Sequence, residues 1–311
     1  AENWLNSIFA NNIPKKIGYS CLTPLISVFG GVAGDATITR ISDNEFWIIS
    51  SGAAERYQKR FFNSVSLPEN TSFSSRTADM CGFNIAGPKS REILQRLSNQ
   101  DLSSKNWSFM QSGTLSIAGV SCLALRVSFT GDLGWEIYCD TNKQEIVYKA
   151  LVQEAVNEQG GPVGSRALMS LRIEKGYGSW SREYSPEIWP HECGLEKLCK
   201  LDKEFLNKAA LSENIKNAPR ENLVLIHLNE DDCQVSNADA TGGEPIFKNG
   251  KGLGRVTSGA YGYSVGMSLA LGYVKDVVPG DCVDVMVLGQ PHRGKILKTP
   301  PFDPEGKILR G

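Results

Sequence analysis

Histidine is scarce in this chain, and its three histidines lie far apart in the sequence. His191, His227 and His292 show no metal-ligand spacing, and His191-Glu192-Cys193 is not part of an H-E-x-x-H motif or of a Cys/His cluster. We therefore expect no metal site. A Gly-x-Gly-x-x-Gly sequence after a first strand is also lacking, so the chain carries no flavin or nicotinamide fingerprint of its own.

Excess charge, long apolar runs and paired cysteines are lacking as well. The net charge is −1 over 311 residues, which argues against a nucleic-acid or acidic-membrane partner. The apolar stretches are too short to span a bilayer. None of the eight cysteines falls in a Cys-x-x-Cys pair. We expect reduced, mostly buried thiols, which fit the cytoplasm or the mitochondrial matrix.

A glycine-rich stretch followed by an aspartate is the first motif that is present. Gly30 and Gly31 predict a turn, because glycine reaches positive φ without steric cost, and Gly34 lets another group approach the backbone. Asp35 follows, and residues 36–39 read as a strand that leaves it. A carboxylate at the start of a strand is well placed to meet a ligand. The alternative is an aspartate that only closes a hairpin.

A second motif is a Thr-Gly-Asp turn between two predicted strands, residues 123–128 and 135–138. In a strand of period two, Glu136 and Tyr138 share one face, and the residues that alternate with them are apolar. Burial of a carboxylate without a partner is costly. Glu136 is therefore expected to face either solvent or a ligand.

The order of the predicted elements indicates an α+β protein. Strands and helices alternate without regular β-α-β units, which favours α+β layers over a doubly wound sheet. Beyond residue 221 the pattern is all β, and a small β-barrel is predicted from about residue 218. We predict two domains, residues 1–217 and 218–311. The predicted helices cover residues 2–12, 53–63, 90–97, 144–157, 165–175 and 203–211.

Three further features follow the two motifs along the chain, namely Gly87-Pro88-Lys89, Arg166 and the sequence LRIEKG at residues 171–176. In this order the motifs resemble the folate-binding aminomethyltransferase family, whose best-known member is the T-protein of the glycine cleavage system. Residues 171–180 and 254–274 resemble more closely the C-terminal folate domains of dimethylglycine and sarcosine dehydrogenases and oxidases. The resemblance covers nearly the whole chain.

The resemblance implies an aminomethyltransferase-type fold of mixed α/β layers with a C-terminal β-barrel. In the family, several dozen residues precede the helix predicted at residues 2–12, and this sequence lacks them. We therefore expect the numbering to start inside a longer polypeptide.

The resemblance also implies roles for individual residues. Asp35 matches the family acid beside N10 of tetrahydrofolate, where a fixed carboxylate stabilises developing positive charge and relays a proton. Thr37 lies on the same strand face and is expected to bind the cofactor through its hydroxyl. Glu136 matches the glutamate that accepts hydrogen bonds from the pterin. Backbone groups of Ile137 and Tyr138 are expected to extend that contact.

Some positions of the expected folate site depart from the family pattern. Leu22 and Phe129 stand where many relatives carry tyrosine, and Ser51 stands at about the position of an asparagine. Arg166 matches a family arginine that suits the anionic tail of folate or fixes Glu136. The alternative for Arg166 is a solvated side chain at a helix start.

The sequence therefore predicts a tetrahydrofolate-dependent one-carbon transferase that acts on a methylated amine or related donor, with a flavoprotein domain or subunit as a possible partner. The alternatives are the folate-capturing domain of a dimethylglycine or sarcosine dehydrogenase and methyl transfer from another donor, such as a sulfonium compound. A folate-binding regulatory protein without transferase activity is a further alternative from a different class.

Overall fold

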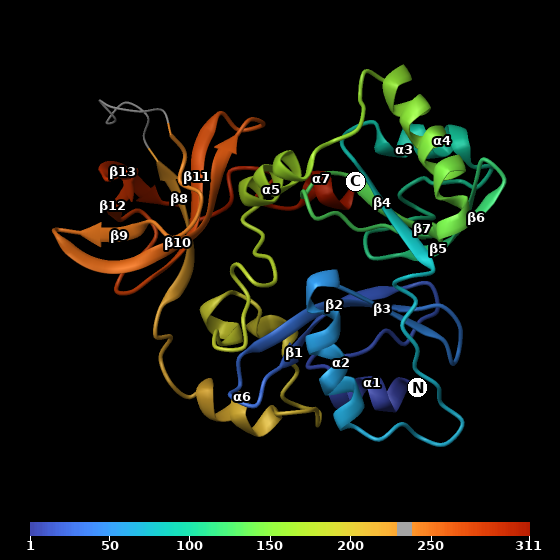
Figure 1. Ribbon diagram of the computed structural model, residues 1–311, viewed down its shortest axis with the longest axis horizontal. Helices are drawn as coiled ribbons and strands as arrows, with labels where there is room; N and C mark the ends of the chain where they lie inside the picture. Colours follow the sequence, from blue (N-terminus) through green and yellow to red (C-terminus); the bar gives the residue numbers. More distant parts are fainter. Residues whose placement is uncertain (229–237) are drawn as a thin grey trace. The chain divides into compact units, whose positions relative to one another are not determined.

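The computed structural model describes residues 1–228 and 238–311, and the described chain forms two compact units (Figure 1). Unit 1 comprises Ala1–Thr23, Ala36–Val163 and Glu305–Gly311, and unit 2 comprises Pro24–Asp35 and Gly164–Pro304. The mixed helices and sheets and the closed C-terminal barrel confirm the predicted fold class. The predicted division at residues 217 and 218 stays a prediction. No helix in the described ranges is long and apolar enough to cross a membrane.

The chain passes between the units within two strands, β1 (Ser20–Ile26) and β2 (Val32–Arg40). Strand β2 begins earlier than predicted, so Asp35 lies inside the strand and not at its start. The reason is that Val32 and Ala33 are fully buried and extended, although the preceding glycines suggested a longer turn.

Unit 1 contains an antiparallel sheet of order β4-β7-β6-β5. A sheet of order β1-β2-β3 lies partly in unit 1, since β1 and β2 continue into unit 2. The further elements of unit 1 are α1 (Glu2–Ile8), β3 (Phe46–Ser50), α2 (Glu55–Ser64), β4 (Met80–Ala86), α3 (Ser90–Leu97), β5 (Ser112–Ile117), β6 (Val120–Leu125), β7 (Gly134–Asp140), α4 (Gln144–Asn157) and α7 (Lys307–Arg310).

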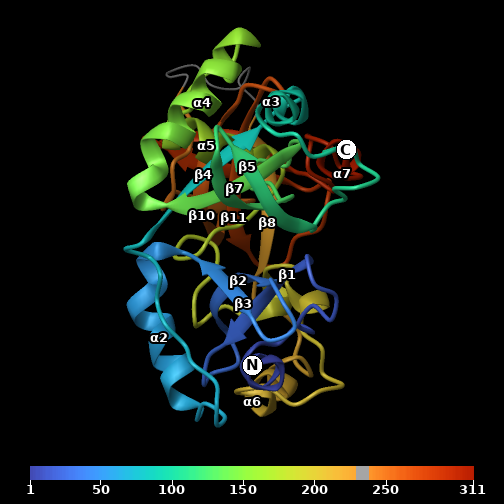
Figure 2. The same cartoon turned by 90° about the vertical axis from the view of Figure 1, so that its right-hand side faces the viewer.

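The core of unit 1 lies between the four-stranded sheet and helices α3 and α4 (Figure 2). Trp135 and Ile137 of β7 are fully buried there, together with Leu94 of α3 and Val147 of α4. The predicted alternation of β7 is confirmed, since its apolar residues fill this core. The polar residues between them project from the opposite face of the sheet.

Unit 2 contains α5 (Ser165–Glu174), α6 (Lys208–Asn214) and a six-stranded barrel of order β10-β11-β8-β13-β12-β9. The barrel strands are β8 (Asn222–Leu228), β9 (Pro245–Lys248), β10 (Lys251–Gly262), β11 (Met267–Val274), β12 (Cys282–Val287) and β13 (Gln290–Ile296). Strand β13 was not predicted, because its sequence QPHRGKI has few apolar residues.

The helix predicted at residues 203–211 begins only at Lys208. Asn207 has φ +63°, in the left-handed region, and therefore separates residues 203–206 from the helix.

A buried ion pair joins three parts of unit 2. The Arg172 and Glu183 side chains are fully buried, and Arg172 Nη1 lies 2.9 Å from Glu183 Oε2. The other carboxylate oxygen of Glu183 accepts hydrogen bonds from Thr257 Oγ1 at 2.8 Å and Ser258 Oγ at 2.5 Å, both on β10. Tyr273 of β11 donates to the Glu183 carbonyl at 2.7 Å. The pair therefore ties α5 and the segment after it to the barrel.

Candidate functional site

The turn before Asp35 is built by hydrogen bonds and by two glycines. Ser27 N donates to the Gly31 carbonyl at 2.8 Å, and Gly30 N donates to the Ser27 carbonyl at 2.9 Å. Gly30 has φ +76°, a conformation that favours glycine, and the Pro186 carbonyl leaves no room for a Cβ at Gly31. The sequence correctly predicts the turn. The group that approaches its backbone comes from residues 186–188 and meets Gly31, and the approach predicted at Gly34 stays a prediction.

Residues 184–188 pack directly on β2 and form one side of the Asp35 environment. Val32 N donates to the Ile188 carbonyl at 2.8 Å, and Val32, Tyr184 and Ile188 share an apolar cluster. Burial raises the pKa of the Tyr184 hydroxyl, and Asp35 is one of the nearby groups that raise it further. Tyr184 is not among the residues predicted for the site, because an aromatic residue in a loop carries no distinctive signal.

Asp35 itself is a half-buried carboxyl group without a side-chain hydrogen-bond partner in the part of the chain that the structure describes. Burial raises its pKa, and a hydrogen bond from its own backbone partly offsets the effect. A carboxylate held in this way is poorly solvated and remains free to interact with a ligand.

Glu136 and Tyr138 form a hydrogen-bonded pair on the polar face of β7. Tyr138 donates from its hydroxyl to Glu136 Oε2 at 2.7 Å. Burial raises the pKa of Glu136, and this hydrogen bond opposes the increase. Glu136 Oε1 has no hydrogen-bond partner within residues 1–228 and 238–311, so it can accept from a ligand.

Gly82 on β4 determines where the Tyr138 ring lies. The two residues are register partners, and a Cβ at Gly82 would lie 2.9 Å from Tyr138 Cε1. The ring therefore lies directly over the glycine, and a larger side chain at position 82 would displace it.

The backbone of β7 pairs with the neighbouring strands β4 and β6. Ile137 is the register partner of Phe83 on β4 and of Ala124 on β6. The expected contact of folate with backbone groups of Ile137 and Tyr138 stays a prediction. The side chains of Glu136 and Tyr138 project from the sheet and take no part in the backbone pairing between the strands.

The remaining predicted residues are distributed over both units. Leu22, Thr37, Ser51 and Phe129 are half-buried in unit 1, where Thr37 pairs in register with Ile49. In unit 2, Arg166 is exposed near the start of α5. Their roles in folate binding stay predictions.

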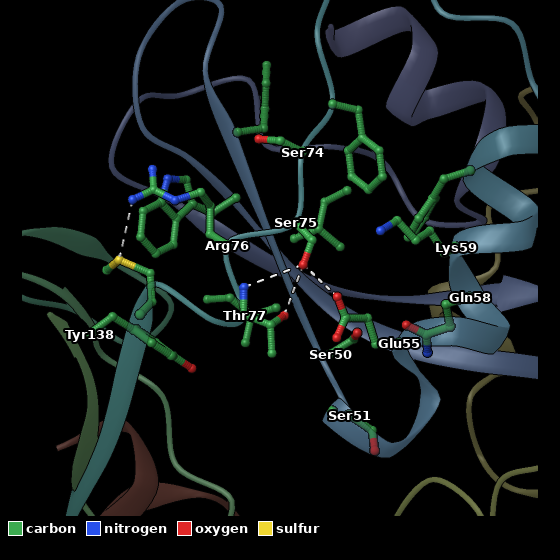
Figure 3. A pocket seen from close by; sticks show the side chains of 18 of the residues that line it. Ser50, Ser51, Glu55, Gln58, Lys59, Ser74, Ser75, Arg76, Thr77 and Tyr138 are labelled. Carbon is green, nitrogen blue, oxygen red and sulfur yellow. Dashed lines mark hydrogen bonds between the residues drawn. The ribbon is translucent and has the colours of Figure 1, made fainter. Parts of the chain in front are cut away.

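A pocket of about 560 Å³ opens in unit 1 between β3, α2 and residues 72–77 (Figure 3). We call it the α2 pocket. Ser51 and Tyr138 line it, so it includes two of the predicted cofactor-binding residues. Since Tyr138 also holds Glu136, the α2 pocket adjoins the Glu136–Tyr138 pair. The sequence did not indicate the α2 pocket, because residues 72–77 form no regular secondary structure.

The mixed α/β layers and the closed C-terminal barrel are those of an aminomethyltransferase-type fold. Residues 1–203 match the GCVT N-terminal domain, and residues 222–303 match the glycine cleavage T-protein C-terminal barrel domain. The chain belongs to the glycine cleavage T-protein family, a family of folate-dependent aminomethyltransferases.

Curated relatives include both long dehydrogenases and shorter transferases. Mitochondrial dimethylglycine dehydrogenase from Homo sapiens is 32% identical over 302 residues, which cover 95% of this chain and 34% of that protein. The aminomethyltransferase of Desulfitobacterium hafniense strain Y51 is 27% identical over 304 residues, which cover 95% of this chain and 80% of that protein. The chain thus spans about a third of the length of the dehydrogenases that it matches.

A solved structure supports the fold. The aminomethyltransferase T of the glycine cleavage system from Bartonella henselae superposes with a TM-score of 0.83 at 20% identity. The superposition covers 97% of this chain and 81% of that chain.

Proposed function

We propose that this chain transfers a one-carbon group, as methylene or methyl, from a small methylated or aminomethyl donor to tetrahydrofolate. The observation that carries the proposal is the Glu136–Tyr138 pair, in which one carboxylate oxygen is held by the tyrosine and the other is unshared. A carboxylate with a free oxygen matches the amino and ring N–H donors of a pterin.

In this proposal the two carboxylates act differently. Tetrahydrofolate supplies the nitrogen that receives the one-carbon group. Glu136 orients the pterin, and Tyr138 fixes the Glu136 rotamer. Asp35 stabilises positive charge at the reacting atoms and exchanges a proton, because its side chain has no described partner that would neutralise it. Thr37 and Phe129 are proposed to contact the cofactor.

Replacement of Glu136 tests the pterin site. Glu136→Gln keeps the shape of the side chain and removes its charge. We expect tetrahydrofolate binding to weaken by roughly 1.5–3 kcal/mol, the usual contribution of a hydrogen bond to a charged group. Calorimetric titration of tetrahydrofolate onto both proteins measures the difference. Glu145→Gln, at an exposed position of α4, is the matched control. Equal affinities for wild type and Glu136→Gln would remove the pterin assignment.

A second candidate function is capture of the one-carbon group within a longer amine-oxidising enzyme. It is favoured by the 32% identity to dimethylglycine dehydrogenase, of which this chain matches only about a third. In this version a flavoprotein domain or subunit oxidises the amine, and folate captures the iminium before water releases formaldehyde. We propose the cytoplasm or the mitochondrial matrix as the compartment, since the relatives include mitochondrial enzymes.

Incubation without a flavoprotein separates the candidates. Capture of a one-carbon group oxidised elsewhere predicts little product from this chain with tetrahydrofolate and dimethylglycine, sarcosine or a sulfonium donor, whereas direct transfer predicts product in that mixture. Product should form when an amine dehydrogenase is added, and chromatography of the folates measures it. Efficient methyl-tetrahydrofolate formation without a flavoprotein would instead establish direct transfer. Folate binding without transfer in every mixture would identify a regulatory protein.

A further inference from the structure

Arg126 is a fully buried arginine at the point where β6 ends. Its Nε has no hydrogen-bond partner in the described part of the chain, and no carboxylate there forms an ion pair with it. Burial, followed by the charge of Arg91, lowers the pKa of Arg126 to about 10, so the guanidinium stays charged at neutral pH. Burial of a charge without a carboxylate partner is costly. The cost indicates that the two terminal nitrogens of Arg126 have a role beyond the general stability of the fold.

The two terminal nitrogens of Arg126 each bind a backbone carbonyl. Nη1 donates to the Gly134 carbonyl at 3.1 Å, and Nη2 donates to the Leu309 carbonyl at 2.8 Å. Gly134 is the first residue of β7, whereas Leu309 lies in α7, 183 positions beyond Arg126 in the sequence. Because the guanidinium is planar, its donors have fixed directions. One side chain therefore sets the positions of β7 and α7 relative to the end of β6.

The hydrogen bond to Gly134 closes the loop of residues 127–133. Arg126 precedes this loop and Gly134 follows it, so a side chain at one end of the loop binds the backbone at the other end. Ser90 of α3 holds the same end of the loop, since its Oγ donates to the Leu133 carbonyl at 2.9 Å. Fixed ends reduce the number of conformations that are open to the residues between them.

Arg126 also contacts the residue that precedes Glu136. Its guanidinium carbon lies 4.8 Å from the centroid of the Trp135 ring, and Trp135 is fully buried in the core of unit 1. Successive side chains of a strand point to opposite faces of the sheet. Because Arg126 fixes Trp135 on the core face, it also fixes Glu136 on the polar face, where Glu136 meets Tyr138.

We propose that Arg126 is a positioning residue for the folate site, which holds the loop of residues 127–133 and the start of β7 so that Phe129 and Glu136 meet the pterin. Helix α7 takes part in this arrangement, because the Leu309 carbonyl binds the second terminal nitrogen. The inference rests on the proposed function in one respect, namely that Glu136 binds the pterin of tetrahydrofolate.

Two variants of Arg126 test the proposal by calorimetric titration of tetrahydrofolate. Arg126→Met keeps the length of the side chain and removes every donor, and we expect it to weaken binding roughly tenfold. Arg126→Lys keeps the charge but lacks the planar set of donors, so it should recover only part of the affinity. Circular dichroism checks that each variant folds, and Arg126→Lys carries the test if Arg126→Met does not fold. Wild-type affinity in the folded variants would overturn the proposal.

Arg91→Met is the matched control. The Arg91 guanidinium carbon lies 5.5 Å from the centroid of the same Trp135 ring, but its Nη1 donates to the Leu102 carbonyl and not to the start of β7. The control thus removes a neighbouring cation and leaves the loop of residues 127–133 closed. We expect its affinity for tetrahydrofolate to equal that of the wild type. An equal loss in Arg91→Met and Arg126→Met would overturn the assignment to Arg126.

A double-mutant cycle with Glu136→Gln separates positioning from a general effect on the fold. If Arg126 acts through Glu136, its replacement should weaken tetrahydrofolate binding much less, by roughly threefold or less, once Glu136 is already glutamine. The same tenfold loss in both backgrounds would show that Arg126 does not act through Glu136 and would overturn the proposal. Absence of tetrahydrofolate binding in the wild-type chain would count against the proposed function instead.

Discussion

The Asp35→Asn variant is expected to form the folate product at least roughly 10²-fold more slowly than the wild-type chain, while its tetrahydrofolate affinity stays within a few-fold. The amide keeps the shape of Asp35 but can neither carry the negative charge nor exchange the proton. Since no described side chain is hydrogen-bonded to Asp35, no neighbouring group replaces the lost charge or the lost proton exchange. Single-turnover measurement of methylene-tetrahydrofolate, with calorimetry of folate binding, checks both parts.

Asp202→Asn is the matched control, because Asp202 is exposed in the same unit. A normal rate in Asp35→Asn would show that Asp35 only shapes the strand. The wild-type rate should fall as the pH falls through the pKa of Asp35, which burial raises above the ordinary aspartate value. This limb of the pH profile should be missing in Asp35→Asn.

The same pKa shift predicts how Asp35 affects stability. Because the pKa is higher in the folded than in the unfolded chain, the folded state holds the proton over a wider pH range. The contribution of Asp35 to the free energy of unfolding therefore declines as the pH rises from the unfolded pKa through the folded one. At neutral pH, Asp35→Asn should be at least as stable as the wild type, which thermal unfolding measures.

The Glu183→Ala variant is expected to lose about 3–5 kcal/mol of folding free energy, the usual cost of removing one member of a buried ion pair. It leaves Arg172 charged and unpaired in a fully buried position. It also leaves Thr257 and Ser258 without their carboxylate acceptor. Denaturant unfolding of the full chain measures the loss.

Two further variants separate the ion pair from simple truncation. Glu145→Ala removes an exposed partner of Lys149 and should cost only about 0.3–0.5 kcal/mol. A double variant, Arg172→Met with Glu183→Leu, removes both buried charges and should recover much of the lost stability. If Glu183→Ala were as stable as Glu145→Ala, the buried network would not hold α5 to the barrel.

The sequence predicted those parts of the fold that depend on local pattern. The α3 and α4 boundaries were predicted correctly, because α3 has a clear apolar stripe and α4 is followed by glycines. The alternation of β7 followed from its period of two. By contrast, the start of α6 depended on the left-handed conformation of Asn207, and β13 depended on pairing with β8 and β12, which no local pattern reveals.

For the candidate site, the sequence by itself determined the residue types and the face that each occupies. Glu136 and Tyr138 project from one side of β7 because a strand alternates, and Asp35 follows a turn that glycine permits. Only the tertiary structure decided what these groups contact. Tyr138 holds Glu136, residues 184–188 cover β2 beside Asp35, and residues 72–77 line the α2 pocket together with β3 and α2. Some of these contacts join residues that are distant in sequence, and others depend on how an irregular segment packs. Contacts of both kinds are fixed by burial of the whole chain rather than by local pattern.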